Sequence, residues 1–538
     1  MIDFFTSRSG SPTFSIDGVR FHSSYDPAKE ASRFIDLNLT DKNPSTIILL
    51  GEGLGYLSNV IKIKYPQTKL VTIFYSAKIF YSSSIEHIFS WHPDMRQSLY
   101  DFLKETIDEF DLEGLYVIEW PAAASLFPDI SLRVNKILSQ VIKELRGNLV
   151  TTAAMGRLWI RNTFLNYVNI DHIYTGNPVP EGIPVFLAAS GPELENALDF
   201  LNSIRNRVYL ISLPSALQCL AAHRIIPDMI VITDPGYYSI YHLRWNAETD
   251  TLVSMPFSAV CGIWRYPLNV FPVSQEYFFE QAFFSGSNFI IPLVPPRGTV
   301  AATALDLALN LSNSKIIISG LDFCFNDLIS HSRPHSFDLL FHLSSYRLTP
   351  FYSQKFRRTL DFAPIRIDKK RIRTSLPLKT YKGWFDNLDS NVKKRIVQFK
   401  PSSLTIQGVE EVDENIIARN IIARNNTFGS EKLCYKNTSY PDFNIRKKNA
   451  KNVIKNWITQ FKELENKLKN ISFPGLIKNN FSLFQLLYFI ETTDLAKIKR
   501  NIRLSGKKAT RDKLFSLIER SDNFLQKLLA KINKIKAR

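Results

Sequence analysis

The sequence predicts an α/β fold: two Rossmann-like units with mostly parallel sheets, followed by a basic α-helical C-terminal domain. Short apolar runs end on small or glycine-containing turns and lead into helical patterns, which is the order of parallel-sheet units. This order occurs twice before residue 425. Beyond residue 445, apolar residues recur at three- and four-residue intervals, as in amphipathic helices. At 538 residues and 45% apolar content, the chain can form several packed domains.

The first predicted unit covers residues 1–150. Its first strand, residues 45–50, runs into the turn Gly-Glu-Gly-Leu-Gly-Tyr at residues 51–56, and further strands are expected at residues 70–75 and 115–119. Glycines between a strand and a helix let the backbone approach a phosphate closely. Here the spacing is Gly-x-Gly-x-Gly, and Glu52 puts a negative charge where the phosphate would lie. The pattern favours a structural turn and leaves ligand binding there open.

The second predicted unit covers residues 151–424 and opens with a helical pattern over residues 151–167. Because apolar runs alternate with helical stretches, we expect a mostly parallel sheet covered on both faces. The expected strands are residues 185–189, 208–212, 229–233, 289–294 and 315–319.

A linker at residues 425–444, rich in Asn, Thr, Ser, Lys and Pro, precedes a basic helical domain at residues 445–538. Residues 441–538 contain 23 Lys or Arg and 8 Asp or Glu, a net charge of +15, so only +2 of the total of +17 belongs to the first 440 residues. Such a surface can dock an acidic partner, nucleic acid or an anionic membrane, or be a solvated helical face.

Targeting and metal-binding signals are missing from the sequence. The first ten residues do not have the pattern of a secretory signal, and no run of about 18 apolar residues occurs, so we expect no membrane span and a cytoplasmic location. The four cysteines are far apart and form no Cys-x-x-Cys pair, which argues against structural zinc and against a disulfide framework. They are Cys219, Cys261, Cys324 and Cys434.

Polar residues follow three strands of the second unit where each strand ends. Parallel strands present their carboxyl ends at one edge of the sheet, so we expect these residues to converge on one pocket. The candidates are Ser190, Gly191 and Pro192 after the first strand, Ser212 and Ser215 at the second, and Thr233 and Asp234 at the third.

Each strand end suggests a role. The free N–H groups after Gly191, together with the helix dipole, favour the phosphate of an activated donor. Ser212 and Ser215 are candidates for contacts to a nucleotide base or ribose. Asp234 could bind a ribose or sugar hydroxyl, hold a divalent cation or act as a base, or it could simply cap the next turn.

Two further segments carry candidate residues. Arg297, Gly298 and Thr299 precede a small-residue helix, with Thr299 where an N-cap hydroxyl belongs, so this helix start is a second candidate for ligand contact. Asp322 follows the strand at residues 315–319 and would add a second carboxylate to the same edge.

The densest reactive cluster is His331-Ser332-Arg333-Pro334-His335-Ser336. Histidine can take a proton at neutral pH, so His331 and His335 are the candidate catalytic residues together with Asp234. Arg333 can hold a carboxylate through two parallel hydrogen bonds. No third metal ligand stands at a diagnostic spacing, so we expect no metal site.

These motifs resemble those of the motility accessory factor (Maf) family, bacterial proteins that glycosylate flagellin. The resemblance spans most of the chain before the basic tail, and it departs from the family at Glu193, where a serine is usual. The matching motifs are residues 21–27 (FHSSYDP), 51–56, 190–194 (SGPEL), 226–228, 233–235, 298–300 and 320–322.

This resemblance implies a central domain similar to bacterial sialyltransferases. It implies transfer of a nonulosonic acid, of the pseudaminic or legionaminic type, from a CMP-sugar to Ser or Thr of flagellin, in support of flagellar assembly and motility. The activated sugar is then the donor and no further cofactor is required.

Two alternatives stay open. The central block also resembles archaeal 6-hydroxymethylpterin diphosphokinase (MptE-like proteins), which implies an ATP-dependent kinase needing Mg²⁺, with Asp234 and Asp322 as its ligands. The third possibility is a non-catalytic flagellin-binding protein whose basic tail docks an acidic partner.

Overall fold

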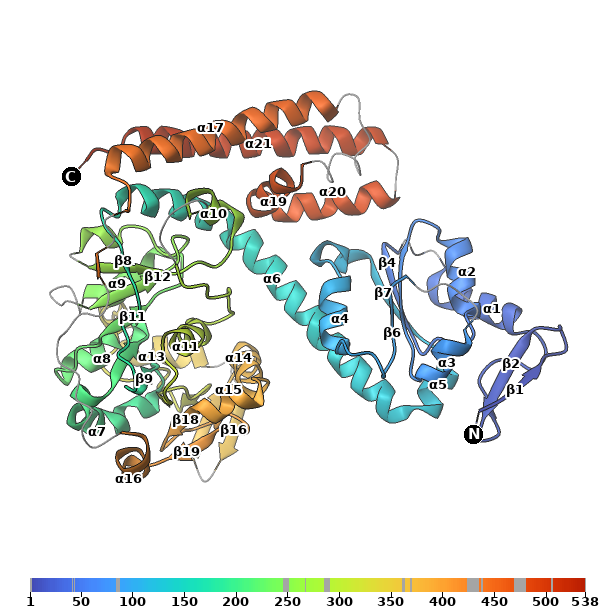
Figure 1. Cartoon of the computed structure of the whole chain (residues 1–538), viewed down its shortest axis with the longest axis horizontal. Coiled ribbons are helices and arrows are strands. Elements are labelled where there is room, and N and C mark those ends of the chain that lie inside the picture. Colours follow the sequence, from blue (N-terminus) through green and yellow to red (C-terminus); the bar gives the residue numbers. More distant parts are fainter. Residues whose placement is uncertain are drawn as a thin grey trace. The chain divides into compact units, whose positions relative to one another are not determined.

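The computed structural model has a mixed α/β fold with parallel sheets and a helical C-terminal region, which confirms the predicted fold class (Figure 1). It divides into two compact units, residues 1–156 with 457–526 and residues 157–456 with 527–538. The domain boundaries expected from the sequence stay predictions. The structure describes all residues except 1, 41, 43, 84–87, 245–250, 267, 285–290, 360–362, 368–369, 423–434, 437–438, 469–479, 505–506 and 538.

The first unit contains a parallel sheet of four strands in the order β6-β5-β4-β7. All five residues of β4, which pairs with β5 on one side and β7 on the other, are buried, and this explains the continuous apolar run in the sequence. The three strands expected in this unit are confirmed as β4, β5 and β7. The strands are β4 (Thr46–Leu50), β5 (Lys69–Ile73), β6 (Ser90–Trp91) and β7 (Leu115–Glu119), beside an antiparallel sheet of β1 (Ile2–Thr6), β2 (Pro12–Ile16) and β3 (Val19–Arg20).

Helices complete the first unit, and the 42-residue α6 runs from it into the second. The C-terminal end of α19 contacts η1. The Tyr488 hydroxyl donates to the Glu109 carboxylate, and the Tyr488 ring packs on Phe110. The helices are α1 (Pro27–Leu39), α2 (Tyr56–Lys64), α3 (Ala77–Ser82), α4 (Leu99–Thr106), the 3-10 helix η1 (Glu109–Gly114), α5 (Pro121–Leu126), α6 (Pro128–Asn169), α19 (Phe481–Ile490) and α20 (Thr492–Leu504). Two more helices, α17 (Phe443–Leu468) and α21 (Lys507–Asn533), have residues in both units.

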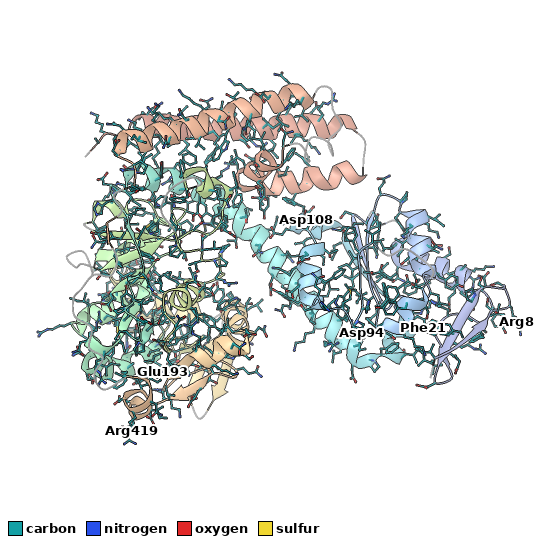
Figure 2. The ribbon with its side chains drawn as sticks, viewed as in Figure 1. Arg8, Phe21, Asp94, Asp108, Glu193 and Arg419 are labelled. Carbon is teal, nitrogen blue, oxygen red and sulfur yellow. The ribbon has the colours of Figure 1, made fainter. Side chains whose placement is uncertain are left out.

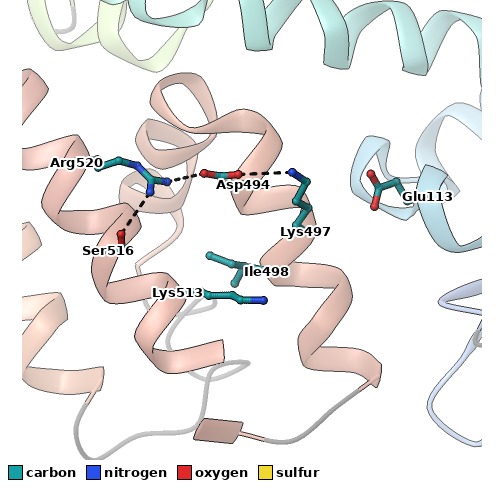
Figure 3. A pocket seen from close by; sticks show the side chains of 7 residues that line it. All are labelled: Glu113, Asp494, Lys497, Ile498, Lys513, Ser516 and Arg520. Atoms are coloured by element: carbon teal, nitrogen blue, oxygen red, sulfur yellow. Dashed lines mark hydrogen bonds and ion pairs between the residues drawn. The ribbon is translucent and has the colours of Figure 1, made fainter. Parts of the chain in front are cut away.

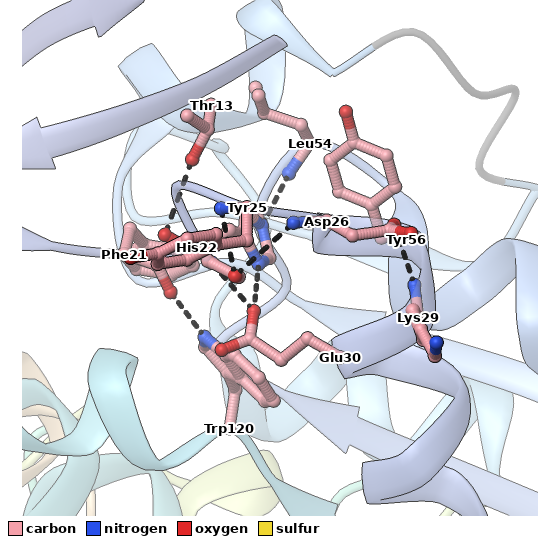
Figure 4. Close-up of polar contacts among 12 residues, drawn as sticks. Thr13, Phe21, His22, Tyr25, Asp26, Lys29, Glu30, Leu54, Tyr56 and Trp120 are labelled. Carbon is pink, nitrogen blue, oxygen red and sulfur yellow. Dashed lines mark hydrogen bonds and ion pairs between the residues drawn. The ribbon is translucent and has the colours of Figure 1, made fainter. Parts of the chain in front are cut away.

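The glycine-rich turn before α2 is filled by the protein's own groups. The Glu52 carboxylate is fully buried and accepts hydrogen bonds from the N–H of Gly53 and the N–H of Ser58, both at 2.9 Å. A Cβ on Gly53 would lie 2.1 Å from Nε2 of His22, which itself accepts from the N–H of Leu54 (Figure 4). Glu52 therefore occupies the start of α2, as the structural-turn interpretation expects.

The second unit is built on an eight-stranded parallel sheet, in the order β13-β12-β11-β10-β9-β14-β18-β19. The expected strands at residues 185–189, 208–212, 229–233 and 315–319 correspond to β9, β10, β11 and β14. The strands are β9 (Val185–Ala188), β10 (Tyr209–Ser212), β11 (Met229–Val231), β12 (Leu252–Met255), β13 (Asn269–Pro272), β14 (Ile316–Ser319), β18 (Ile396–Phe399) and β19 (Glu410–Val412).

Alternate residues of these strands pack into two different cores, so both faces of the sheet are covered. Val185 and Leu187 pack with α11 on one face. Phe186 and Ala188 pack with α7 and α8 on the other. Successive side chains of a strand point to opposite faces of the sheet, so neighbouring residues enter different cores.

The remaining elements of the second unit are short, and three of them form a small antiparallel sheet, β15-β17-β16. They are β8 (Tyr174–Thr175), η2 (Pro192–Ala197), α7 (Leu198–Ser203), η3 (Arg205–Arg207), η4 (Pro214–Ala216), α8 (Leu217–Ala222), η5 (Tyr237–Ser239), α9 (Ile240–Leu243), η7 (Ile263–Arg265), α10 (Phe278–Phe284), α11 (Val300–Leu311), β15 (Phe325–Asn326), α12 (Asp338–Leu343), α13 (Phe351–Thr359), β16 (Ala363–Ile367), β17 (Lys370–Thr374), α14 (Leu376–Asp386), α15 (Ser390–Arg395), α16 (Glu414–Ile416), η8 (Ile417–Ile421) and β20 (Tyr435–Lys436).

The strand expected at residues 289–294 falls partly outside the described residues. Of its described part, Leu293 makes a single parallel bridge with Ser274. Most of the predicted linker, and Cys434, also lie outside the described residues.

Candidate functional site

Three adjacent parallel strands, β9, β10 and β11, end at one edge of the large sheet, as the sequence predicts. The structure brings the first two strand ends into contact, because the Ser215 hydroxyl donates to Oγ of Ser190 at 2.7 Å. The loop that carries the histidine pair joins them, since the N–H of Ser332 donates to the carbonyl of Ser190 at 2.8 Å. The candidate site therefore lies where these strand ends meet the 331–337 loop.

The structure corrects the phosphate site expected at Gly191. The N–H of Gly191 donates to the carbonyl of Gly320 at 2.6 Å, and the N–H of Glu193 donates to Oδ2 of Asp322 at 2.9 Å. A Cβ on Gly191 would lie 2.2 Å from that same carboxylate oxygen. Pro192, buried in the first turn, supplies no N–H. The turn thus binds the protein's own Asp322 carboxylate in place of a phosphate.

Glu193, labelled in Figure 2, is buried instead of facing a ligand. Its carboxylate accepts from the Ser403 hydroxyl at 2.8 Å and from the Asn196 amide at 2.7 Å. The acidic residue that departs from the family motif is therefore held inside the domain by two neutral donors.

The remaining strand-end residues differ in accessibility. Ser212 is fully buried and donates to the carbonyl of Leu213 at 2.9 Å, which corrects its expected contact to a nucleotide. Thr233 is half-buried, while Asp234 is exposed and accepts from the N–H of Gly236 at 2.8 Å. Asp234 therefore caps the turn after β11 and keeps one carboxylate oxygen outside that hydrogen bond.

A cluster of three histidines forms the core of the site. The rings of His331 and His335 stack with centroids 4.4 Å apart, and the ring of His242, from α9, lies 5.5 Å from that of His335. Phe337 packs against His242 at 4.5 Å and against His335 at 5.4 Å. The structure therefore joins the two histidines singled out from the sequence and adds a third.

Burial keeps these imidazoles neutral. Desolvation lowers the pKa of His331 and of His242 to about 4, and that of His335 to about 2. The neighbouring charge of Asp234 acts in the opposite direction on the pKa of His242, which places this carboxylate close to the cluster. Nδ1 of His335 accepts from the N–H of Phe337 at 3.4 Å, and Nδ1 of His331 lies 2.9 Å from Oγ of Ser330.

Several buried polar atoms of the cluster have no hydrogen-bond partner within the part of the chain that the structure describes. They are Nδ1 of His242, Nε2 of His335 and Oγ of Ser336, on side chains more than nine-tenths buried. A buried polar atom without a partner costs about 1–3 kcal/mol, so such groups usually bind something. Two imidazole nitrogens and a hydroxyl suit an anionic oxygen or a sugar hydroxyl.

Arg333 does not enter the histidine cluster. Its guanidinium donates to Glu195 through Nε and Nη2, both at 3.0 Å, and its backbone N–H donates to the same carboxylate at 2.9 Å. The bidentate geometry predicted for Arg333 is present, but an internal carboxylate takes it. The Arg333 side chain is nevertheless exposed, and its expected contact with a sugar carboxylate stays a prediction.

The segment before α11 makes its contacts elsewhere in the unit. Thr299 is the N-cap of α11 and accepts from the N–H of Ala301 at 3.0 Å, as expected. Arg297 pairs with Asp306 at 2.6 Å and lies over the ring of Trp384, while Gly298 is exposed. These contacts give the segment a structural role and leave its predicted ligand contact untested.

The sequence-based search missed His242. It stands eight residues after Asp234, on the short helix that follows the strand end, and this position was the available signal. It also missed the exposed rings of Tyr237 and Tyr238, which lie between these two residues and contact each other at 6.1 Å.

A separate cavity of about 490 Å³ lies within the first unit (Figure 3). The guanidinium of Arg520, which lines this cavity, donates to Asp494 at 2.6 Å and to Glu491 at 3.2 Å. None of the residues singled out from the sequence lines it. The lining residues are Glu113 of η1, Asp494, Lys497 and Ile498 of α20, and Lys513, Ser516 and Arg520 of α21.

Comparison with solved structures places this geometry in a known fold. The structure of a Maf glycosyltransferase from Magnetospirillum magneticum AMB-1 superposes with a TM-score of 0.62, over 99% of this chain and 92% of that one, at 10% identity. This chain has the Maf glycosyltransferase fold. This likeness in fold agrees with the resemblance noted in the sequence, and it also includes the helical C-terminal part, which that resemblance does not cover.

Sequence comparisons add two findings. The family described as 6-hydroxymethylpterin diphosphokinase MptE-like matches residues 161–328, a range that includes Asp234 and His242 but ends before His331. Two uncharacterized proteins of Treponema pallidum (strain Nichols) are also similar. One is 22% identical over 62% of this chain and 70% of its own length, the other 27% identical over 31% and 73%.

No helix among the described residues is both long and apolar enough to cross a membrane. Within the same residues, no group of three His, Cys, Asp or Glu side chains is arranged to hold a metal ion.

Proposed function

We propose that this protein is a glycosyltransferase that moves a nonulosonic acid, of the pseudaminic or legionaminic type, from its CMP donor to Ser or Thr of flagellin, in support of flagellar assembly and motility. The main support is the buried histidine cluster at the sheet edge, in which one nitrogen each of His242 and His335 has no hydrogen-bond partner among the described residues. The Maf glycosyltransferase fold agrees with this proposal.

The reaction needs a proton acceptor and a place for a leaving phosphate. The bond between the anomeric carbon and the phosphate oxygen breaks, and its electron pair leaves on CMP. The acceptor hydroxyl oxygen bonds to that carbon, and its proton passes to an imidazole nitrogen of His331 or His335. An activated donor needs mainly positioning and charge stabilisation from the protein.

The lowered pKa values of the histidines keep their rings neutral before the donor binds. Neutral imidazoles can accept a proton, but at a pKa of about 4 His331 is a weak base. The negative charge of a phosphate beside the rings would raise their pKa towards the working range, since an opposite charge favours the protonated form. Donor binding would then prepare the proton acceptor.

In this proposal the amides at Gly191 have no direct contact with the donor, because Gly320 and Asp322 occupy them. Arg333 pairs with Glu195 but is exposed, and it stays the proposed partner of the sugar carboxylate. Ser190 and Ser215, at the strand ends, and the exposed Asp234 are the polar groups left to orient the sugar or the ribose. Thr233 lies beside Asp234 on the same strand end.

The second candidate function is an ATP-dependent 6-hydroxymethylpterin diphosphokinase, which the match over residues 161–328 favours. Asp234 and Asp322 were its expected Mg²⁺ ligands. Asp322 does not suit that role, because its buried carboxylate accepts from the N–H of Glu193. Asp234 alone, exposed at the strand end, could reach a cation carried by a nucleotide.

The test uses the purified full-length protein with CMP-pseudaminic or CMP-legionaminic acid and flagellin. Release of CMP together with an increase in flagellin mass, both unaffected by EDTA, is the expected result. AMP formation from ATP and 6-hydroxymethylpterin that EDTA abolishes would favour the kinase. Flagellin binding without either reaction would favour a non-catalytic flagellin-binding protein.

A further inference from the structure

The loop that carries the histidine pair continues into a helical hairpin, formed by α12 (Asp338–Leu343) and α13 (Phe351–Thr359). The rings of His342 and Phe351 stack at 4.1 Å across it, and Lys355 pairs with Asp338 at 2.9 Å. The side chain of Gln354 donates to the Ser345 hydroxyl at 3.1 Å. The hairpin is therefore a defined local structure.

The outside of this hairpin presents large apolar side chains to solvent. Leu343 is 75% exposed, Leu348 81% and Tyr352 74%. No residue of α12 is buried, so this helix is not held in place by a core of its own. Contiguous exposed apolar surface on a soluble protein usually marks an interaction site. The exposed residues are Leu339, Leu343, Tyr346, Leu348, Tyr352 and Phe356.

The charge of the hairpin indicates the kind of partner. Residues 337–359 contain four basic residues, Arg347, Lys355, Arg357 and Arg358, and one acidic residue, Asp338, which gives a net charge of +3. Arg347 and Arg357 are exposed beside the apolar residues. An acidic partner is complementary to this surface, whereas a second copy of the chain would face it with the same positive charge.

The hairpin is also adjacent to the candidate site. Phe337, the residue before α12, packs on the rings of His242 and His335. The charge of Asp338 raises the pKa of His331 and the charge of Lys355 lowers it, so this ion pair of the hairpin lies close to the cluster. A polypeptide held on this hairpin would have its neighbouring residues within reach of the proton acceptor.

We propose that the α12–α13 hairpin is the docking surface for the acceptor polypeptide, through a segment that is apolar on one face and acidic on the other. This inference rests on the proposed function, since it assigns a place to that reaction's protein substrate. A membrane is the less suitable partner, because interfacial helices present one continuous apolar face, while here two short helices and their turn share the apolar residues.

The test measures binding of synthetic peptides to the full-length protein by fluorescence anisotropy. The probe is a helical peptide of about 18 residues, or five turns, with leucines on one face and glutamates on the other. Its control has lysine at each glutamate position. We expect the acidic peptide to bind, with an affinity that falls as salt is raised, and the basic peptide to bind at least about tenfold more weakly.

Variants locate the binding surface. Leu343→Ser combined with Tyr352→Ser should weaken binding of the acidic peptide by about tenfold or more, as expected for the loss of apolar anchors. Arg357→Glu should weaken it as well. The matched control is Leu37→Ser, because Leu37 is 86% exposed on α1 and lies outside the hairpin.

Three results would overturn the inference. In the first, the hairpin variants bind the acidic peptide as tightly as the Leu37→Ser control does. In the second, the protein binds phosphatidylserine vesicles and the hairpin variants abolish that binding. In the third, the protein is a dimer that the hairpin variants convert to monomers in analytical ultracentrifugation.

Titration with CMP separates this inference from the proposed function. Wild type and hairpin variants should bind CMP equally, because the hairpin residues changed are not part of the histidine cluster. If the acidic peptide binds as expected but wild type fails to bind CMP, the donor chemistry is wrong while the hairpin stands as a polypeptide-binding surface.

Discussion

The Asp322 carboxylate accepts a hydrogen bond from the backbone N–H of Glu193 at 2.9 Å, in the turn that begins at Gly191. The first unit contains a comparable arrangement, in which the Glu52 carboxylate accepts from the N–H of Ser58 at the start of α2. In both units an internal carboxylate takes the place that a phosphate takes in dinucleotide-binding folds. Ligand binding in the second unit is therefore better sought at the histidine cluster.

Replacing Asp322 should destabilise the second unit. Asp322→Ala leaves the buried N–H of Glu193 without its acceptor, so we expect the free energy of unfolding to fall by about 1–3 kcal/mol. Asp322→Asn should lower the free energy of unfolding by less, because the amide oxygen of asparagine can still accept the hydrogen bond from the N–H of Glu193. Differential scanning calorimetry measures the change, with Asp94→Ala, at an exposed site, as the control. Equal melting temperatures for Asp322→Ala and this control would contradict the assigned role.

Gly191→Ala should also be destabilising, since the new methyl group would lie 2.2 Å from Oδ2 of Asp322. The matched control is Gly383→Ala within α14, where an added Cβ meets nothing within 4 Å. That control should be neutral or stabilising by up to about 1 kcal/mol, because alanine is the better helix former. The order of the two melting temperatures tests the close approach at Gly191.

Stability should fall as the pH is lowered from about 6.5 towards 4. The pKa of His242 and of His331 is about 4 in the folded protein, below the ordinary value of 6.5, so in this window the unfolded chain binds more protons. Stability then increases with pH, and the contribution is complete above pH 6.5. Thermal unfolding across this range measures the slope. His242→Gln should reduce it, whereas Leu37→Ser, a change of a non-titrating residue at an exposed site, should leave it unchanged.

The histidines should control transfer more strongly than stability. His335→Gln and His331→Gln are each expected to lower the rate of CMP release by roughly 100-fold or more, the usual contribution of a positioned proton acceptor. His223→Gln, at an exposed site, is the control. CMP binding to wild type should be accompanied by proton uptake, detectable by calorimetry in buffers of different ionisation enthalpy. Wild-type rates in both variants would show that the cluster does not perform the proton transfer.

Burial on both faces explains only some of the predicted strands, because β12 and β18 are also buried throughout and were not predicted. β4, β9 and β14 read as continuous apolar runs because every residue in them is buried. β19 was missed because its sequence, Glu-Glu-Val, is that of a partly exposed edge strand. Helix starts with a side-chain cap, such as Thr299 before α11, were equally readable.

The site was only partly predictable, for a physical reason. Polar residues at strand ends mark the correct edge, but the sequence does not show which of them pair with each other. Arg333 donates to Glu195, which lies 138 positions away in the chain. The N–H of Glu193 donates to Asp322, which lies 129 positions away. His242 joins the cluster through a short helix whose own pattern is too brief to recognise.

The central claim is tested most directly by the intact mass of flagellin from cells in which the gene for this protein is deleted or carries His335→Gln. The cells must be shown to still make the CMP-sugar. The proposal predicts flagellin without its sugar in both strains and restored mass when the wild-type gene is returned. Flagellin of unchanged mass in the deletion strain would contradict it.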